Sequence, residues 1–121
     1  MIHIKSKRIQ AVFYRSVTGN EPVRKWLKAM SKNDKVLIGT DIRTVELGWP
    51  IGMPVCRKLE DGIYEVRTTL KDTISRVLFA IEDGEMILLE GIIKKQQKTP
   101  REAINIAKSR LRLWRKNYEK E

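Results

Sequence analysis

The sequence predicts an α+β fold in which an antiparallel β-meander carries two N-terminal helices and one C-terminal helix packed on the sheet. Two observations predict it. Apolar residues alternate with a period of two across residues 55–93, and two Asp-Gly pairs divide this stretch as hairpin turns do. On either side of it, apolar residues recur every three or four positions, which is typical of one helix face. The connections between the strands are too short for parallel crossovers, so neighbouring strands are expected to run antiparallel.

The N-terminal part is predicted to hold one strand and two helices. Residues 9–15 favour a short strand because β-branched and aromatic residues dominate them. Asn20 is the expected cap of a first helix that runs to about Met30. A second helix is expected over residues 35–47, ending at Gly48. Its inward-facing residues are predicted to be Val36, Ile38, Ile42 and Val45.

The rest of the chain is predicted to hold four strands and a final helix. The strands are expected over residues 55–60, 63–70, 74–82 and 85–93. The helix is expected from about residue 100 to residue 118, with Thr99 as its cap and Pro100 in its first position. Its apolar stripe is predicted to be Ile104, Ala107, Leu111, Trp114 and Tyr118.

Composition limits the possible functions. The 121 residues, 1–121, are expected to form one domain. They carry 25 Lys and Arg against 15 Asp and Glu, a net charge of +10, which indicates either a nucleic-acid or acidic protein partner or an ordinary solvated surface. Cys56 and His3 are too few for a zinc site, so we expect no metal and no cofactor. Without a membrane span or a signal-peptide core, the protein is expected in the cytoplasm, away from membranes.

Two-residue turns would fix the register of the sheet, because facing residues share one side. Lys58 would then face Glu65, and Arg67 would face Arg76. Arg76 would also face Gly91, and Asp72 would face Lys95. The predicted core face carries Leu59, Tyr64, Val66, Leu70, Val77, Phe79, Ile81, Met86, Leu88 and Ile92. The other face carries Lys58, Glu65, Arg67, Arg76, Gly91 and Lys95, mixed with Ile63, Ile74, Leu78, Leu89 and Ile93.

The pairing of Arg67 with Arg76 needs an explanation, since like charges directly opposite each other are destabilising. One explanation is an anion shared by the two guanidinium groups, which we favour. The other is a structural ion-pair network with nearby carboxylates, namely Glu65, Glu85 or Glu90. A three-residue middle turn would instead place the two arginines on opposite faces.

A second basic cluster, Lys94, Lys95 and Lys98, precedes the last helix. The N-terminus of a helix favours anions through its free N–H groups and its dipole. From Lys94 onward the chain has ten basic and three acidic residues, a net charge of +7. The basic residues of the helix itself are interpreted as a solvated or partner-binding face.

Three segments, KLEDGIYEVR (residues 58–67), SRVLF (75–79) and LLEGIIKKQQKTP (88–100), resemble the RelE/ParE toxin superfamily, in particular its phage-derived, HigB-like branch. The resemblance covers nearly the whole chain. It implies a RelE-like toxin domain and a type II toxin–antitoxin toxin that enters the ribosomal A site and cleaves translated mRNA without a metal ion. The partners it implies are the ribosome, mRNA and a helix-turn-helix (HigA-like) antitoxin.

The same resemblance implies that Arg67, Arg76, Lys94 and Lys95 belong to the active site, with Lys58 and Glu65 near it, and the predicted sets follow. The catalytic set is Arg67, Arg76, Lys95, Lys94 and Glu65, and the RNA-binding set is Lys58, Lys98 and Arg101. Arg67 and Arg76 are expected to clamp the scissile phosphate while the RNA 2′-OH attacks it. Lys95, with Lys94, would hold the phosphate or protonate the leaving oxygen. Glu65 is the carboxylate placed to act as base, and Tyr118 is a further candidate.

The chain departs from the branch at two positions. Glu90 stands where the branch often has His, and Ile92 where it often has Phe. Glu90 is expected on the core side, so the general base stays unassigned. Two alternatives remain open: a ParE-like toxin that binds a topoisomerase and cleaves nothing, and a degenerate member that only binds an antitoxin or RNA.

Overall fold

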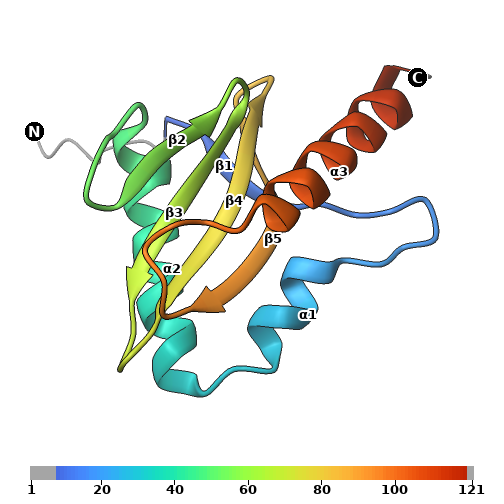
Figure 1. The fold of residues 1–121 in the computed structure, drawn as a ribbon. Helices are drawn as coiled ribbons and strands as arrows, with labels where there is room; N and C mark the ends of the chain where they lie inside the picture. The colour runs from blue at the N-terminus through green and yellow to red at the C-terminus, as the bar shows by residue number, and fades with distance from the viewer. Residues whose placement is uncertain (1–7, 120–121) are drawn as a thin grey trace, which may run out of the picture.

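The computed structural model describes residues 8–119, and their side chains through residue 117. The predicted α+β class is confirmed. The elements, labelled in Figure 1, are β1 (Gln10–Phe13), α1 (Pro22–Lys28), α2 (Lys32–Gly48), β2 (Cys56–Glu60), β3 (Ile63–Thr69), β4 (Ile74–Glu82), β5 (Glu85–Lys94) and α3 (Arg101–Glu119). None of the helices within residues 8–119 has the length and apolar character that crossing a membrane requires.

The five strands form one mixed sheet in the order β1-β5-β4-β3-β2. Strands β2 to β5 pair antiparallel in sequence order, which confirms the predicted meander. Strand β1 pairs parallel with β5, with Gln10 opposite Glu85 and Phe13 opposite Leu88. Local sequence did not predict this parallel pairing.

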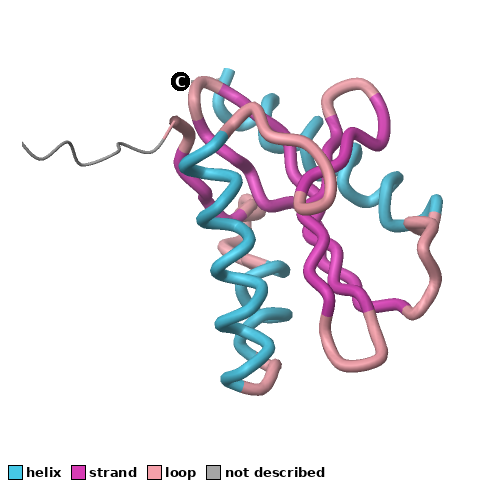
Figure 2. The backbone as a smooth tube through the Cα atoms, turned by 90° about the vertical axis from the view of Figure 1, so that its left-hand side faces the viewer, coloured by secondary structure: helices cyan, strands magenta, loops and turns pink. Residues whose placement is uncertain are grey.

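The sheet lies between two helical layers (Figures 1 and 2), with α1 and α2 on one side and α3 on the other. Each layer has its own core. The buried core on the side of α1 and α2 consists of Ile9, Val23, Ile38, Ile42, Val45, Cys56, Val66, Leu70, Val77, Phe79, Met86 and Leu88. The buried core under α3 consists of Tyr14, Ile63, Leu78, Ala80, Ile87, Leu89, Ala103, Ile104, Ala107, Leu111 and Trp114.

The turns have the predicted length, and Arg67 does face Arg76. Two β-bulges shift the register elsewhere: one between Lys58 and Glu60 in β2, and one in β5 opposite the junction of Leu78 and Phe79. An extra residue on one strand turns every side chain beyond it to the other face. Lys58 therefore faces Tyr64 and not Glu65.

The bulge in β5 corrects several further predictions. Arg76 faces Ile92, whereas Gly91 faces Val77. The last pair of the ladder is Ile74 with Lys94, so the predicted pairing of Asp72 with Lys95 does not form. Leu59 and Ile92 pack in the core under α3, on the face opposite the one predicted.

Gly91 shows why the corrected register suits the sequence. It lies on the side of α1, where a Cβ atom at this position would come within 2.4 Å of the Trp26 ring. Because the indole ring occupies the space of a side chain, only glycine allows α1 to pack this closely on β5.

Several predicted helix ends and faces are also corrected. Glu21, and not Asn20, directly precedes α1. Helix α2 begins three residues earlier than predicted, because the Ser31 hydroxyl accepts a hydrogen bond from the backbone N–H of Asp34 at 3.2 Å. Val36 is 57% exposed and does not face the core.

Helix α3 begins at Arg101, directly after Pro100, so Thr99 is not its cap. The side chain of Tyr118 and the whole of His3 lie outside the described residues.

Candidate active site

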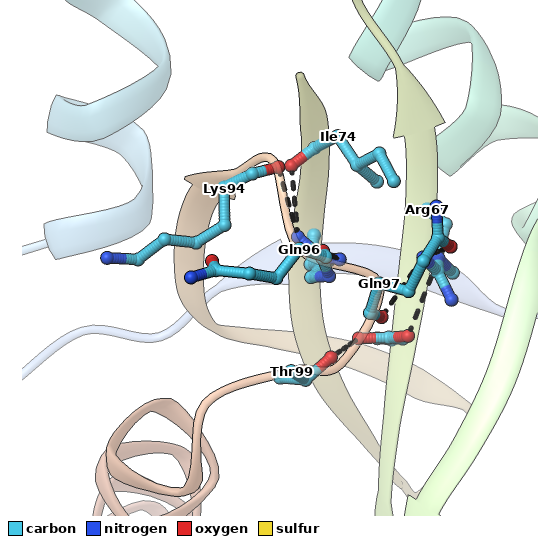
Figure 3. Close-up of polar contacts among 8 residues, drawn as sticks. Arg67, Ile74, Lys94, Gln96, Gln97 and Thr99 are labelled. Atoms are coloured by element: carbon cyan, nitrogen blue, oxygen red, sulfur yellow. Dashed lines mark hydrogen bonds and ion pairs between the residues drawn. The ribbon is translucent and has the colours of Figure 1, made fainter. Parts of the chain in front are cut away.

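Arg76 on β4 anchors the segment that follows β5. Its side chain is completely buried, although a charged residue is seldom buried without a partner. Its guanidinium donates Nη1–H to the carbonyl oxygens of Ile74 at 3.3 Å and Lys94 at 3.4 Å, and Nη2–H to the carbonyl oxygen of Gln96 (Figure 3). Arg76 therefore holds the loop of residues 94–98 (the basic loop), and it does not present its guanidinium to solvent as the predicted phosphate clamp would.

The charge of Arg76 is maintained under unfavourable conditions. Burial lowers the pKa of its guanidinium, and the neighbouring positive charge of Arg67 lowers this pKa further. The negative charge of Glu65 acts in the opposite direction. Because the guanidinium pKa starts far above neutral pH, Arg76 stays charged and depends on the carboxylate and the loop carbonyls for stability.

Arg67 on β3 lies at the edge of this buried cluster and reaches the surface. Its Nη2–H donates to the backbone oxygen of Gln97 at 3.2 Å and to the side-chain oxygen of Gln97 at 2.9 Å. Its Nε lies 3.8 Å from a carboxylate oxygen of Glu65, and 11% of its side chain is exposed. Arg67 is thus oriented from two sides with part of its guanidinium accessible.

Glu65 is the carboxylate that balances the charges of Arg67 and Arg76, as the explanation by a structural ion-pair network required. It is fully buried, and one oxygen accepts a hydrogen bond from the hydroxyl of Thr99. Its other oxygen has no hydrogen-bond partner among the described residues and faces Arg67. Glu85 lies at the far end of β5, and Glu90 forms an ion pair with Arg110 at 3.1 Å. The predicted network therefore involves Glu65 alone.

The basic loop separates two grooves. The first, which we call the Arg67 groove, has a volume of about 560 Å³ and is bounded by Arg67, Gln97 and Thr68 on one side and α2 on the other. The second, which we call the lysine groove, has a volume of about 380 Å³ and is lined by Lys94, Lys98 and Arg101 among others. The Lys94 side chain points away from Arg67 (Figure 3), so these two residues of the predicted catalytic set line different grooves.

The remaining predicted residues occupy different surroundings. Lys95 and Lys98 are exposed on the basic loop. Arg101 donates a hydrogen bond to Glu60, and Lys108 contacts the other oxygen of Glu60 at 3.2 Å; both contacts lower the pKa of the Glu60 carboxyl. Lys58 forms an exposed ion pair with Asp61 at 3.5 Å and, by register, belongs to the opposite face from Glu65, which corrects its predicted place beside the site.

Three residues that sequence reasoning missed belong to the site. Arg57 lies directly opposite Glu65 in the sheet, in the place predicted for Lys58. Gln97 orients Arg67, and Thr99 holds Glu65. The bulge in β2 is what places Arg57 opposite Glu65, but neither residue type nor spacing in the sequence indicates that bulge.

Cys56 lies under the site without taking part in it. It is 2% exposed, and burial together with the charge of Glu65 raises the pKa of its thiol to about 11. The thiol is therefore neutral at physiological pH and a weak nucleophile. Within residues 8–119, no group of three or more His, Cys, Asp or Glu side chains is arranged to hold a metal ion.

Fold and site together define a small α+β protein with a cationic surface around the basic loop, which hydrogen bonds from Arg76 hold in place. Residues 25–112 match the family described as phage derived protein Gp49-like (DUF891), and this match spans most of the chain. The protein belongs to this family. No curated protein matches the chain.

Proposed function

We propose that this protein is a toxin of a type II toxin–antitoxin module, in the HigB-like branch of the RelE/ParE superfamily, and that it cleaves mRNA on the ribosome. The Gp49-like family is associated with RelE-like toxins, which supports the general class. The observation that carries the specific proposal is the buried Arg76, whose guanidinium fixes a loop of lysines beside the accessible guanidinium of Arg67.

The charge of the site suits an RNA backbone. Arg67 and Arg57 lie on one side of the basic loop, and Lys94, Lys98 and Arg101 line the groove on its other side. A strand that crosses the loop would place successive phosphates near both groups of cations. Such contacts provide affinity without reading sequence.

In the proposed reaction, the 2′-oxygen of the RNA forms a bond to the adjacent phosphorus while the bond from phosphorus to the 5′-oxygen breaks. The 2′-OH loses its proton to water, and the leaving 5′-oxygen gains one, for which the exposed ammonium of Lys95 is the proposed donor. Negative charge grows on the non-bridging oxygens, and the guanidinium of Arg67 stabilises it. Arginine suits this role because its planar fork can contact two oxygens at once.

Arg76 and Glu65 take revised roles in this proposal. Both side chains are fully buried, so we assign them as positioning residues that fix the basic loop and Arg67. The proposal also retains a helix-turn-helix antitoxin as partner: the exposed basic residues of α3, including Arg112 and Lys116, offer an acidic protein segment a complementary surface.

The test is cleavage of a defined mRNA in a reconstituted translation reaction. We expect Arg67→Ala to reduce cleavage by about 100- to 1,000-fold, which is typical for the loss of one donor to a developing oxyanion. Arg43→Ala is the matched control, because it removes the same charge from an exposed position on α2 and should retain full cleavage. Circular dichroism of both variants checks folding.

Full activity of Arg67→Ala would contradict the site assignment. A wild-type protein that leaves mRNA intact but blocks DNA supercoiling by a topoisomerase would overturn the proposal in favour of a ParE-like toxin. A wild-type protein without either activity would overturn it in favour of a degenerate member.

A further inference from the structure

The Arg67 groove has a composition that phosphate binding alone does not require. Leu37 and Met53 at this groove are 40% and 63% exposed, so its wall offers apolar surface to solvent. Across from them lie the ends of β3 and the residue Gln97 of the basic loop. An apolar wall next to a cation suits a ligand that is flat and apolar on its face and anionic at one end.

Thr68 provides the second observation. It lines the groove, and only 3% of the residue is exposed. Its hydroxyl has no hydrogen-bond partner among the described residues. Because a buried hydroxyl without a partner costs free energy, a ligand group that turned this side chain toward the groove and paired with its hydroxyl would gain a favourable contact.

Asp41 on α2 provides the third. It also lines the groove, is half-buried, and makes no hydrogen bond or ion pair with the described residues. A carboxylate accepts hydrogen bonds and does not donate them at neutral pH. The edge of the ligand that meets Asp41 must therefore carry an N–H or O–H donor.

We infer that the Arg67 groove binds the base of the nucleotide whose phosphate contacts Arg67, and that it selects bases with an exocyclic amine over uracil. This inference rests on the proposed function. The amine donates to Asp41, the ring packs on Met53 and Leu37, and the hydroxyl of Thr68 pairs with a ring nitrogen or carbonyl. Uracil has no amine, and its one free ring N–H lies between two carbonyl oxygens that repel a carboxylate, which weakens its contact with Asp41.

The first measurement is binding of nucleoside monophosphates to the intact protein, followed by NMR. We expect AMP and CMP to bind about tenfold more tightly than UMP, which is the discrimination that one good base contact provides. Asp41→Asn should remove this preference. Asp83→Asn is the matched control, because it removes one carboxylate at the distant β4–β5 turn and should keep the preference.

The second measurement is the base found next to the cleaved bond in the reconstituted translation reaction. The wild-type protein should avoid uracil at one adjacent position, and Thr68→Val should weaken this avoidance while Thr68→Ser retains it. Equal binding of AMP and UMP, or an unchanged preference in Asp41→Asn, would overturn the inference even if cleavage occurs. Selective binding without any cleavage would support the groove and overturn the proposed function.

Discussion

Stability measurements can decide whether Arg76 is a buried anchor of the basic loop or an exposed clamp for a phosphate. Arg76→Ala removes three hydrogen bonds from a charged donor to the carbonyl oxygens of Ile74, Lys94 and Gln96. Each such bond contributes about 1.5–3 kcal/mol, but two of them are long at 3.3 and 3.4 Å. The carbonyls of the loop can also rehydrate, because Lys94 and Gln96 are exposed.

The loss of charge adds to this effect. Glu65 stays buried with one neighbouring cation fewer, but it keeps its ion pair with Arg67, so this loss costs less than the roughly 3–5 kcal/mol typical of breaking a buried ion pair. Because these contributions overlap, we expect Arg76→Ala to lower the free energy of unfolding by about 4 kcal/mol in total. Urea denaturation, followed by tryptophan fluorescence, measures it.

Lys94→Ala is the control for the same loop. Its side chain is exposed and points away from Arg67, so the free energy of unfolding should change by less than about 0.5 kcal/mol. If Arg76→Ala costs under about 1 kcal/mol, or no more than Lys94→Ala, Arg76 does not anchor the loop and the positioning role is wrong.

Two further predictions test packing and ionisation. Gly91→Ala should destabilise the protein by about 1–3 kcal/mol, since its Cβ would lie 2.4 Å from the Trp26 ring, whereas Gly39→Ala, with no atom within 4 Å of the new Cβ, should be neutral or stabilising in thermal unfolding. The buried thiol of Cys56 should resist a disulfide reagent at pH 8 until the protein unfolds. Since its pKa rises from 9.0 to about 11 on folding, stability relative to Cys56→Ala should be constant below pH 9 and fall by roughly 2 kcal/mol as pH rises toward 11, and a flat difference would contradict the burial.

Local signals predicted most of the fold. The two Asp-Gly turns and the period of two placed β4 at its observed bounds and the other antiparallel strands to within one residue. The parallel pairing of β1 with β5 joins residues about 75 positions apart, such as Gln10 and Glu85, and no turn connects them. The pairing depends on how α1 and α2, which follow β1 in the chain, pack against the sheet. Periodicity along the sequence does not describe this packing.

The sequence predicted which site residues face each other across the sheet, but not which of them are buried. The two-residue turn between β3 and β4 predicted that Arg67 faces Arg76, and the structure confirms it. Alternation assigned both arginines to the mixed face of the sheet, opposite the predicted core face. The burial of Arg76 arises because the end of β5 and the basic loop supply carbonyl oxygens to a side chain near the start of β4. Residue type alone cannot show this, since arginine is usually exposed.

Glu90 shows how a bulge changes the expected chemistry. Alternation predicted it on the core side, but the extra residue in β5 turns it toward α3, where Arg110 contacts it at 3.1 Å and also donates to the carbonyl oxygen of Leu89 at 2.7 Å. Arg110 additionally lies over the ring of Tyr14, with 5.9 Å between its Cζ and the ring centroid. Glu90 therefore ties α3 to the sheet through the ion pair between its carboxylate and Arg110.

This assignment determines which catalytic effect the proposed reaction can use. The branch that the chain resembles often has a histidine where Glu90 stands, and the chain's single histidine, His3, lies outside the described residues. The carboxylate of Glu65 is fully buried and held by Thr99, so it orients Arg67 and does not reach a substrate hydroxyl directly. Among the described residues, Arg67 is therefore the group that the proposed reaction would use to stabilise the charge of the phosphorane, and this is why the Arg67→Ala variant carries the test of the proposed function.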